Sequence, residues 1–252
     1  MTDRSFTVRM NLLAQRLLSM TDLTSLNDTD DEQTIRKLLK SAATPAGKVA
    51  AVCCFARFIP IAAPALQELG IPLAIVTNFP AGGADVEAAR AETEAAVAVG
   101  ANEIDVVFPY RSLLSGDQKT CAALVRACRE ACGRKVLLKV ILETGRISRD
   151  NDIRRAAQIA GDEGADFLKT STGKTRPGAT QEAVTVLLDV MALYHKRGKS
   201  LGLKVSGGVR TIEMARTYLD MFEDCFGTGS ANPGNFRIGA SSLVRDILSV
   251  LG

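Results

Sequence analysis

Short apolar runs alternate with longer amphipathic stretches along nearly the whole chain. Most of these runs are continuous in valine, isoleucine and leucine rather than alternating with polar residues, which is typical of parallel strands covered by helices. Eight runs predict strands, at residues 19–23, 49–55, 73–79, 103–108, 136–143, 166–171, 201–206 and 236–241. The pattern therefore predicts an α/β protein with a parallel sheet.

The stretches between these runs predict helices with recognisable ends. Residues 84–101 are rich in alanine and glutamate, and Gly100 is a natural stop for a helix there. We expect Asp150 or Asn151 to cap the helix that follows the fifth strand. Thr180 is expected to cap the next helix, with an acidic residue in its first turn.

The number of alternations selects the architecture. Eight predicted strands are joined by seven helical segments, a closing helix is expected at 241–251, and an additional helix at about 6–18 precedes the first strand. This pattern predicts a (β/α)8 TIM barrel with an additional N-terminal helix. A doubly wound open sheet is the main alternative, but its glycine-rich GxGxxG turn does not follow the first strand.

Composition narrows the class of protein further. The chain has 252 residues, 46% of them hydrophobic, and no low-complexity run divides it, so we expect one barrel domain over residues 1–252. A net charge of +3, no tryptophan and only 5% aromatic residues argue against a nucleic-acid partner. The first ten residues lack the apolar core of a signal peptide, and no run is long enough to cross a membrane. We therefore expect a cytoplasmic protein without a membrane partner.

Cysteine and histidine do not form a recognisable site. The six cysteines show no CxxC pair, and no histidine lies near Cys128 and Cys132 to complete a metal site. We expect all six to be buried, reduced thiols, in keeping with the cytoplasm. The single histidine, His195, is expected near the C-terminal end of a helix. The chemistry must therefore be sought among lysines, aspartates and hydroxyl groups.

Charged residues interrupt several of the predicted strands. Asp105, Lys169 and Lys204 lie near the C-terminal ends of strands, where barrel active sites form. Lys139 and Glu143 add a charged pair on the fifth strand. For any one of these residues a structural ion pair inside the barrel is the alternative, with Lys139 packed against Glu143 or Asp105.

Lys169 and Lys204 belong to neighbouring strands, so their amino groups can lie close together. Burial and a second ammonium group both disfavour the charged form of a lysine. A lysine with a lowered pKa attacks carbonyl carbons, and the resulting iminium lets a carbon–carbon bond break without a metal. We expect Asp105 to hold Lys204 and to move protons through a water.

Two glycine-rich segments predict a phosphate site. Residues 206–210 (SGGVR) follow the seventh strand, and residues 239–242 (GASS) follow the eighth and open a helix. Loops after these two strands form the recurrent phosphate site of such barrels. Gly173 and Lys174, after the sixth strand, can reach the same anion. Turn glycines with a capping serine are the alternative interpretation.

Taken together, these segments resemble the deoxyribose-phosphate aldolase family. The resemblance is carried by MTDLTSLN (20–27), VTNFPAGG (76–83), EIDVVFPYRSLLSG (103–116), LLKVILETG (137–145), ADFLKTSTGK (165–174), LKVSGGVR (203–210) and FRIGASSL (236–243). It implies reversible cleavage of 2-deoxy-D-ribose 5-phosphate to acetaldehyde and D-glyceraldehyde 3-phosphate. The reaction would proceed through a lysine Schiff base, without metal or cofactor, in deoxyribonucleoside catabolism. A homodimer is the family-level expectation.

The resemblance also implies a role for each matching residue. Lys169 would be the Schiff-base lysine, Lys204 the neighbour that lowers its pKa, and Asp105 the proton-relay aspartate. The expected substrate-binding residues are Asp22 and Thr24 at the rim of the site, Thr170, and Cys53 as a bystander to the chemistry. The expected phosphate-binding residues are Gly173, Lys174, Gly207, Gly208, Gly239, Ser241 and Ser242.

Two departures and two alternatives accompany this interpretation. The sequence ends at Leu251-Gly252, whereas some relatives carry a C-terminal tail ending in tyrosine; we expect slower proton transfer without it. Residues 53–58 (CCFARF) replace a segment that often holds an aromatic residue and a proline. The alternatives are another Schiff-base barrel aldolase, such as a transaldolase, and a non-catalytic phosphate-binding barrel.

Overall fold

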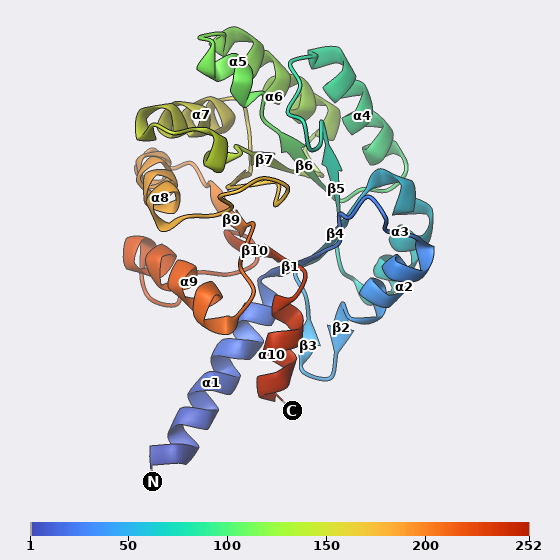
Figure 1. Ribbon diagram of the computed structural model, residues 1–252, viewed down its shortest axis with the longest axis vertical. Coiled ribbons are helices and arrows are strands. Elements are labelled where there is room, and N and C mark those ends of the chain that lie inside the picture. The colour runs from blue at the N-terminus through green and yellow to red at the C-terminus, as the bar shows by residue number, and fades with distance from the viewer. Residues whose placement is uncertain (1, 252) are drawn as a thin grey trace.

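Eight parallel strands close into a barrel surrounded by helices in the computed structural model, which describes residues 2–251, with side chains from residue 6 (Figure 1). The order around the barrel is β1-β10-β9-β8-β7-β6-β5-β4, and β1 also pairs with β4. The strands are β1 Thr21–Thr24, β4 Ala51–Cys54, β5 Leu73–Thr77, β6 Glu103–Val107, β7 Leu137–Ile141, β8 Phe167–Lys169, β9 Gly202–Ser206 and β10 Phe236–Ala240. Each strand overlaps one of the predicted apolar runs in sequence, so the predicted (β/α)8 barrel is confirmed.

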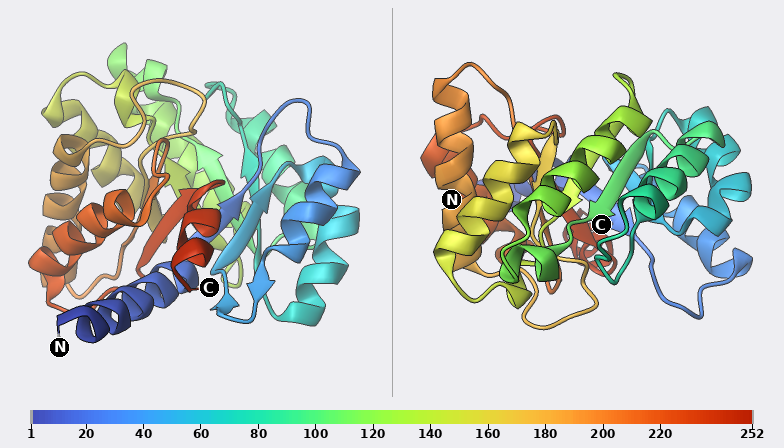
Figure 2. Two further views of the ribbon diagram at one scale, coloured as in Figure 1. Left: turned by 60° about the horizontal axis from the view of Figure 1, so that its bottom comes forward. Right: turned by 90° about the horizontal axis from the view of Figure 1, so that it is seen from above.

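Helices connect successive strands and form the outer layer of the barrel (Figures 1 and 2). They are α2 Glu32–Lys40, α3 Ile59–Leu69, α4 Val86–Ala98, α5 Tyr110–Leu114, α6 Gln118–Cys132, α7 Asp150–Asp162, α8 Gln181–Lys196, α9 Ile212–Phe226 and the closing α10 Leu243–Leu251. Two short 3-10 turns, Ala56–Phe58 and Thr144–Arg146, follow β4 and β7. This is the predicted pattern of seven connections and a closing helix.

The predicted N-terminal helix is also present, as α1 (Thr2–Ser19). It packs against α9 and α10, and its C-terminal turns bury Ala14 and Leu17 completely (Figure 2). Arg16 fixes the contact with α9 by an ion pair with Glu223 and a hydrogen bond to the Ala231 carbonyl at 2.9 Å.

Local details differ from the sequence predictions in two places. A small antiparallel hairpin, β2 (Ala43–Thr44) with β3 (Gly47–Lys48), lies between α2 and β4 and was not predicted. Helix α7 begins at Asp150 itself, so the predicted cap by Asp150 or Asn151 is wrong; the Asp150 carboxylate lies in the first turn, where the helix dipole favours a negative charge. Thr180 caps α8 as predicted, accepting a hydrogen bond from Ala183 N at 3.2 Å.

Successive side chains along each barrel strand point alternately outward, toward the helices, and inward, into the barrel. Residues such as Ile104, Val106 and Leu203 pack in the core between the strands and the helices. The positions between them point inward. On β4 and β5 these inward positions are small and apolar, whereas on the other six strands they include the charged residues of the buried cluster described next.

Candidate active site

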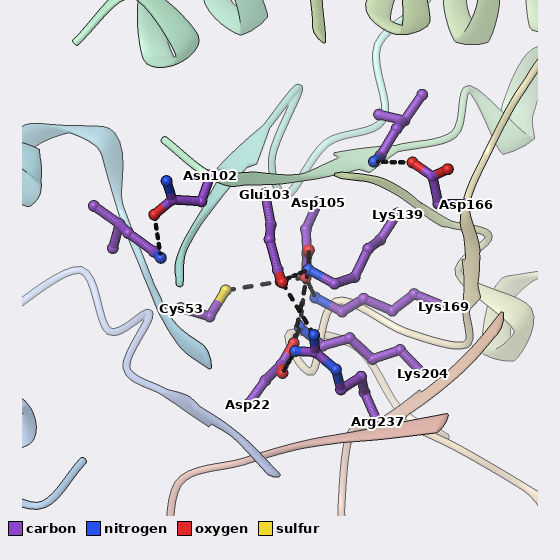
Figure 3. A network of polar contacts seen from close by, with 12 residues as sticks. Asp22, Cys53, Asn102, Glu103, Asp105, Lys139, Asp166, Lys169, Lys204 and Arg237 are labelled. Carbon is purple, nitrogen blue, oxygen red and sulfur yellow. Dashed lines mark hydrogen bonds and ion pairs between the residues drawn. The ribbon is translucent and has the colours of Figure 1, made fainter. Parts of the chain in front are cut away.

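Seven charged side chains meet inside the barrel (Figure 3). All are at most 4% exposed, and they come from six strands: Asp22 of β1, Glu103 and Asp105 of β6, Lys139 of β7, Lys169 of β8, Lys204 of β9 and Arg237 of β10. Buried charges persist only when they are paired, and each of these seven has an ion-pair partner within the set. We call this set the charge cluster.

Asp105 is the centre of the cluster. Its Oδ2 accepts hydrogen bonds from Lys169 Nζ and Lys204 Nζ, each at 2.7 Å, and its Oδ1 accepts one from Lys139 Nζ at 2.9 Å. The strand register produces this arrangement, because Lys169 pairs with Lys204 and Asp105 pairs with Lys139 across neighbouring strands. The predicted closeness of the two lysines and the predicted contact between Asp105 and Lys204 are therefore confirmed.

Glu103 and Arg237 form the part of the cluster that the sequence analysis missed. Arg237 donates to Asp22 Oδ1 at 2.6 Å and to Glu103 Oε1 at 3.1 Å, and Glu103 also pairs with Lys139. Both residues interrupt predicted strands just as Asp105 and Lys204 do, so the same signal could have identified them. They lie at the beginning of β6 and β10 rather than near the C-terminal ends, where barrel active sites form.

One expected pair is replaced by another. Lys139 was expected to pack against Glu143 or Asp105, and it donates a hydrogen bond to Asp105 rather than to Glu143. Glu143 instead accepts hydrogen bonds from the hydroxyl and the backbone N–H of Thr172, at 2.5 and 3.2 Å. Because Glu143 comes after the end of β7, its carboxylate reaches the loop after β8 rather than the barrel interior.

The surroundings of the lysines give them different charge preferences. Burial lowers the pKa of Lys169 below its ordinary value of 10.5, and the Lys204 ammonium acts in the same direction against the pull of Asp105. Burial also acts on Lys204, but the carboxylates of Asp105 and Asp22 outweigh it and raise the pKa of Lys204. Asp22 Oδ2 lies 2.5 Å from Lys204 Nζ. Lys169 is therefore the lysine most readily present as a free amine.

A cavity of about 380 Å³ opens above the cluster at the C-terminal ends of β1, β8, β9 and β10. Within the described part of the chain, Lys169 is the one member of the cluster that lines it. All seven predicted phosphate-binding residues line the same cavity: Gly173, Lys174, Gly207, Gly208, Gly239, Ser241 and Ser242. The structure thus brings the amine and the glycine-rich loops to one site.

Backbone geometry explains the glycines after β9. Gly207 and Gly208 have φ angles of +89° and +98°, a region that side chains rarely adopt. The loop before α8 also approaches here, because Ala179 N donates to Gly207 O at 3.0 Å and a Cβ on Gly178 would lie 2.2 Å from that oxygen. Helix α10 begins directly after Ser242, and the N-terminus of a helix favours an anion.

Three of the expected substrate-binding residues do not line the cavity. Asp22 is fully buried and committed to Lys204 and Arg237, so the expectation that it lies at the rim is not met. The Thr170 hydroxyl donates to Ser206 O and accepts from Ser206 N, both at 3.0 Å, and so ties β8 to β9. Cys53 Sγ lies 4.0 Å from Asp105 Oδ2, and burial raises the pKa of this thiol.

The rim after β1 is built by a small hydrogen-bonded loop. Thr24 lines the cavity as expected, together with Ser25 and Asn27, which the sequence analysis missed. Asp30 holds this loop in place, accepting from Ser25 Oγ at 2.7 Å and from Asn27 N at 2.9 Å. The MTDLTSLN segment already contained these polar residues, but nothing in its spacing showed which of them face a cavity.

The remaining predictions concern cysteine, histidine and metal. Five cysteines are buried and all six are unpaired, but Cys225 is exposed on α9, which corrects the expectation of complete burial. His195 lies in the last turn of α8, as predicted, with its ring in a T-shaped arrangement with that of Phe226. Over residues 2–251 no three His, Cys, Asp or Glu side chains are placed to hold a metal ion, and no helix there is long and apolar enough to span a membrane.

The structure thus combines a closed (β/α)8 barrel with a buried lysine of lowered pKa that lines a cavity beside glycine-rich loops, at the end of the barrel where the active sites of such folds lie. The family profile of the DeoC/LacD family aldolases matches residues 16–243. The chain belongs to this family of aldolases.

Solved structures share the fold over nearly the whole chain. A candidate deoxyribose-phosphate aldolase from Toxoplasma gondii ME49 has a TM-score of 0.90 at 23% identity, covering 97% of this chain and 96% of that one. A candidate deoxyribose-phosphate aldolase from Coccidioides immitis has a TM-score of 0.81 at 26% identity, covering 94% and 86%. The deoxyribose phosphate aldolase of Aeropyrum pernix, described as a tetramer, has a TM-score of 0.74 at 23% identity, covering 99% and 98%. A tetrameric neighbour gives no support to the expected homodimer.

Proposed function

We propose that this protein cleaves 2-deoxy-D-ribose 5-phosphate reversibly to acetaldehyde and D-glyceraldehyde 3-phosphate, with Lys169 as the Schiff-base lysine. One observation carries the proposal: the lysine whose surroundings lower its pKa is also the one that lines the cavity, beside the glycine-rich loops. Membership of the aldolase family supports the reaction type. Neighbours with the same fold that are named for deoxyribose phosphate support the substrate.

The proposed reaction begins with the neutral amine of Lys169. It attacks the C1 aldehyde of the open-chain sugar, and loss of water gives an iminium. Removal of the C3 hydroxyl proton breaks the C2–C3 bond; its electron pair forms the enamine, and C3 becomes the aldehyde carbon of glyceraldehyde 3-phosphate. Protonation of the enamine at C2 and hydrolysis of the iminium then release acetaldehyde and return the amine.

Asp105 and Lys204 are the proposed proton carriers for these steps. Asp105 Oδ2 contacts both lysine nitrogens at 2.7 Å, so a proton on either nitrogen has a short path to the other. The raised pKa of Lys204, caused by Asp105 and Asp22 against the effect of burial, keeps it protonated and able to donate through a water. Its positive charge also disfavours a second ammonium at Lys169.

The phosphate is proposed to bind against the glycine-rich loops of the cavity. Gly207, Gly208 and Gly239 line the cavity, and Ser241 and Ser242, which also line it, precede α10. Lys174 lines it too, and its Nζ lies 3.7 Å from Asp28 Oδ1. Anchoring the phosphate holds the sugar so that its C1 aldehyde can reach Lys169.

An assay of products separates this proposal from its alternatives. With 2-deoxyribose 5-phosphate we expect acetaldehyde and glyceraldehyde 3-phosphate in equal amounts, and no transfer of a three-carbon unit from fructose 6-phosphate to erythrose 4-phosphate. Transfer without cleavage would identify a transaldolase, and phosphate binding with neither reaction would identify a non-catalytic barrel. We place the reaction in the cytoplasm, in deoxyribonucleoside catabolism, in keeping with six unpaired thiols.

A further inference from the structure

The charge cluster contains an odd number of charges. Four of its members are cationic, Lys139, Lys169, Lys204 and Arg237, and three are carboxylates, Asp22, Glu103 and Asp105. If all seven were ionised, the closed barrel would hold an uncompensated positive charge, which burial strongly disfavours. The loss of one proton from one lysine makes the cluster neutral.

Arg237 cannot be the member that loses its proton, because a guanidinium stays charged in proteins. It is also held firmly, by Asp22, Glu103 and the carbonyl of Pro233. Arg237 therefore contributes a fixed positive charge. It also occupies one oxygen of each of two carboxylates, so fewer carboxylate oxygens remain as partners for the lysines.

The lysines share the remaining carboxylate oxygens unequally. Lys204 contacts Asp22 and Asp105, and Lys139 contacts Glu103 and Asp105 with Asp22 further away at 3.8 Å. Of the carboxylates that the structure describes, Lys169 contacts that of Asp105 alone, through an oxygen that it shares with Lys204. The proton deficit therefore falls on Lys169.

From this arrangement we infer that Arg237 and Glu103 are positioning residues that set the charge state of Lys169 from beneath the cavity, Arg237 favouring the free amine and Glu103 opposing it. Neither residue lines the cavity, and both act through Asp22, Asp105, Lys139 and Lys204. The inference rests on the proposed function, since it concerns the reactivity of the proposed Schiff-base lysine.

Among the described residues, the buried ionisable groups inside the barrel around Lys169 come from β1, β4, β6, β7, β9 and β10, and β5, with residues LAIVT, has none. They are Asp22, Cys53, Glu103, Asp105, Lys139, Lys204 and Arg237. Cys53 adds no charge, because burial raises the pKa of its thiol. Among the charged groups, Glu103 and Arg237 are of opposite sign and lie outside the direct contacts of Lys169, so they offer a matched pair of tests.

Removing the two charges should move Lys169 in opposite directions. Arg237→Met leaves three lysines against three carboxylates, so Lys169 can remain protonated and its pKa should rise by about one pH unit. Glu103→Gln leaves four cations against two carboxylates, so the pKa of Lys169 should fall by a similar amount. The double variant restores the original excess and should return the pKa toward that of the unchanged protein. Arg237→Lys keeps the positive charge, so the pKa of Lys169 in this variant should stay near that in the unchanged protein.

The readout is the rate of reductive alkylation of Lys169 by acetaldehyde and cyanoborohydride, followed by peptide mass spectrometry between about pH 5 and pH 9. This measures the free amine directly and does not require cleavage of a sugar phosphate. Circular dichroism and thermal unfolding establish which variants fold. A purely structural role for Arg237 and Glu103 would destabilise the protein without moving the two midpoints in opposite directions.

The outcomes distinguish the inference from the proposed function. If Lys169 is not alkylated in the unchanged protein, the proposed function fails. If Lys169 is alkylated but its midpoint is the same in all folded variants, the inference is overturned while the proposed function stands. If Arg237→Met does not fold, the downward shift in Glu103→Gln and the unshifted midpoint in Arg237→Lys decide the matter, and a missing downward shift overturns the inference.

Discussion

Lys169 and Lys204 share one oxygen of Asp105, yet they differ in access and in the number of carboxylates around them. Lys204 is fully buried between Asp22 and Asp105, whereas Lys169 has one carboxylate partner and lines the cavity. This difference separates a lysine suited to hold a proton from one suited to lose it. The proposal of Lys169 rather than Lys204 as the Schiff-base lysine therefore rests on the neighbours of the two lysines as well as on the family resemblance.

The most direct consequence concerns Lys169 itself. We expect Lys169→Leu to abolish cleavage of 2-deoxyribose 5-phosphate, because no iminium can form. The fold should survive, since leucine fills much of the same volume and leaves three cations against three carboxylates in the cluster. A coupled assay for glyceraldehyde 3-phosphate and circular dichroism measure the two effects. Lys37→Leu, at an exposed position on α2, is the control and should leave the rate unchanged. Retained cleavage in Lys169→Leu would refute the assignment.

Lys204 should control the pH dependence of the reaction. Because the pKa of Lys169 lies below 10.5, the rate should rise with pH as its proton is lost, along a limb that lies below that value. Lys204→Met removes a neighbouring ammonium and leaves Asp105 more available to Lys169, so the limb should move to higher pH. Each unit of movement lowers kcat/KM about tenfold at a pH below the limb. A profile with an unmoved limb would contradict this role for Lys204.

The residues of the site were predictable to the extent that each was a polar exception in an apolar strand. Asp105, Lys169 and Lys204 could be identified in this way, and their contact follows from strand register. The same rule applied to every strand position would have added Glu103 and Arg237. The placement of Thr170 could not be predicted, because a threonine after a strand serves a ligand or a backbone hydrogen bond equally well.

At the scale of elements, the strands were predictable because each is buried on both faces and reads as a continuous apolar run. The β2–β3 hairpin gave no such signal: each of its strands is two residues long, and their side chains are exposed or only partly buried. The N-cap of α7 is Arg149, one residue before the predicted positions, because Asp150 and Asn151 both suit a cap by residue type and residue type does not fix a helix start to within one residue.

The loop after β9 allows a test of the phosphate site. Gly208→Ala should raise KM for 2-deoxyribose 5-phosphate several-fold, because a side chain at φ +98° strains the backbone that faces the anion, while leaving the slow reaction of unphosphorylated deoxyribose nearly unchanged. Gly229→Ala is a matched control, since Gly229 also has a positive φ of +80° with no atom near a built Cβ, but lies in the loop after α9 and does not line the cavity. Equal effects of the two substitutions on KM would argue against a phosphate site at this loop.

At the scale of the whole molecule, the barrel encloses the charge cluster, and the carboxylates of the cluster are paired with its cations. Asp22, Glu103 and Asp105 are each bonded to lysine or arginine, so their oxygens are not free to bind a cation. We therefore expect EDTA to leave the rate of cleavage unchanged, and added Zn²⁺ or Mg²⁺ not to raise it. Strong inhibition by EDTA, reversed by a metal, would favour a metal-dependent aldolase.

The central claim is that Lys169 forms the covalent intermediate. Incubation with 2-deoxyribose 5-phosphate, reduction with borohydride and peptide mass spectrometry test it most directly, because reduction makes the adduct permanent at the lysine that formed it. We expect a single adduct on the peptide that contains Lys169, with loss of activity in proportion to the modified fraction. An adduct on Lys204 would contradict the role of Lys169. So would an enzyme that keeps its full activity in the presence of borohydride and carries no adduct at Lys169.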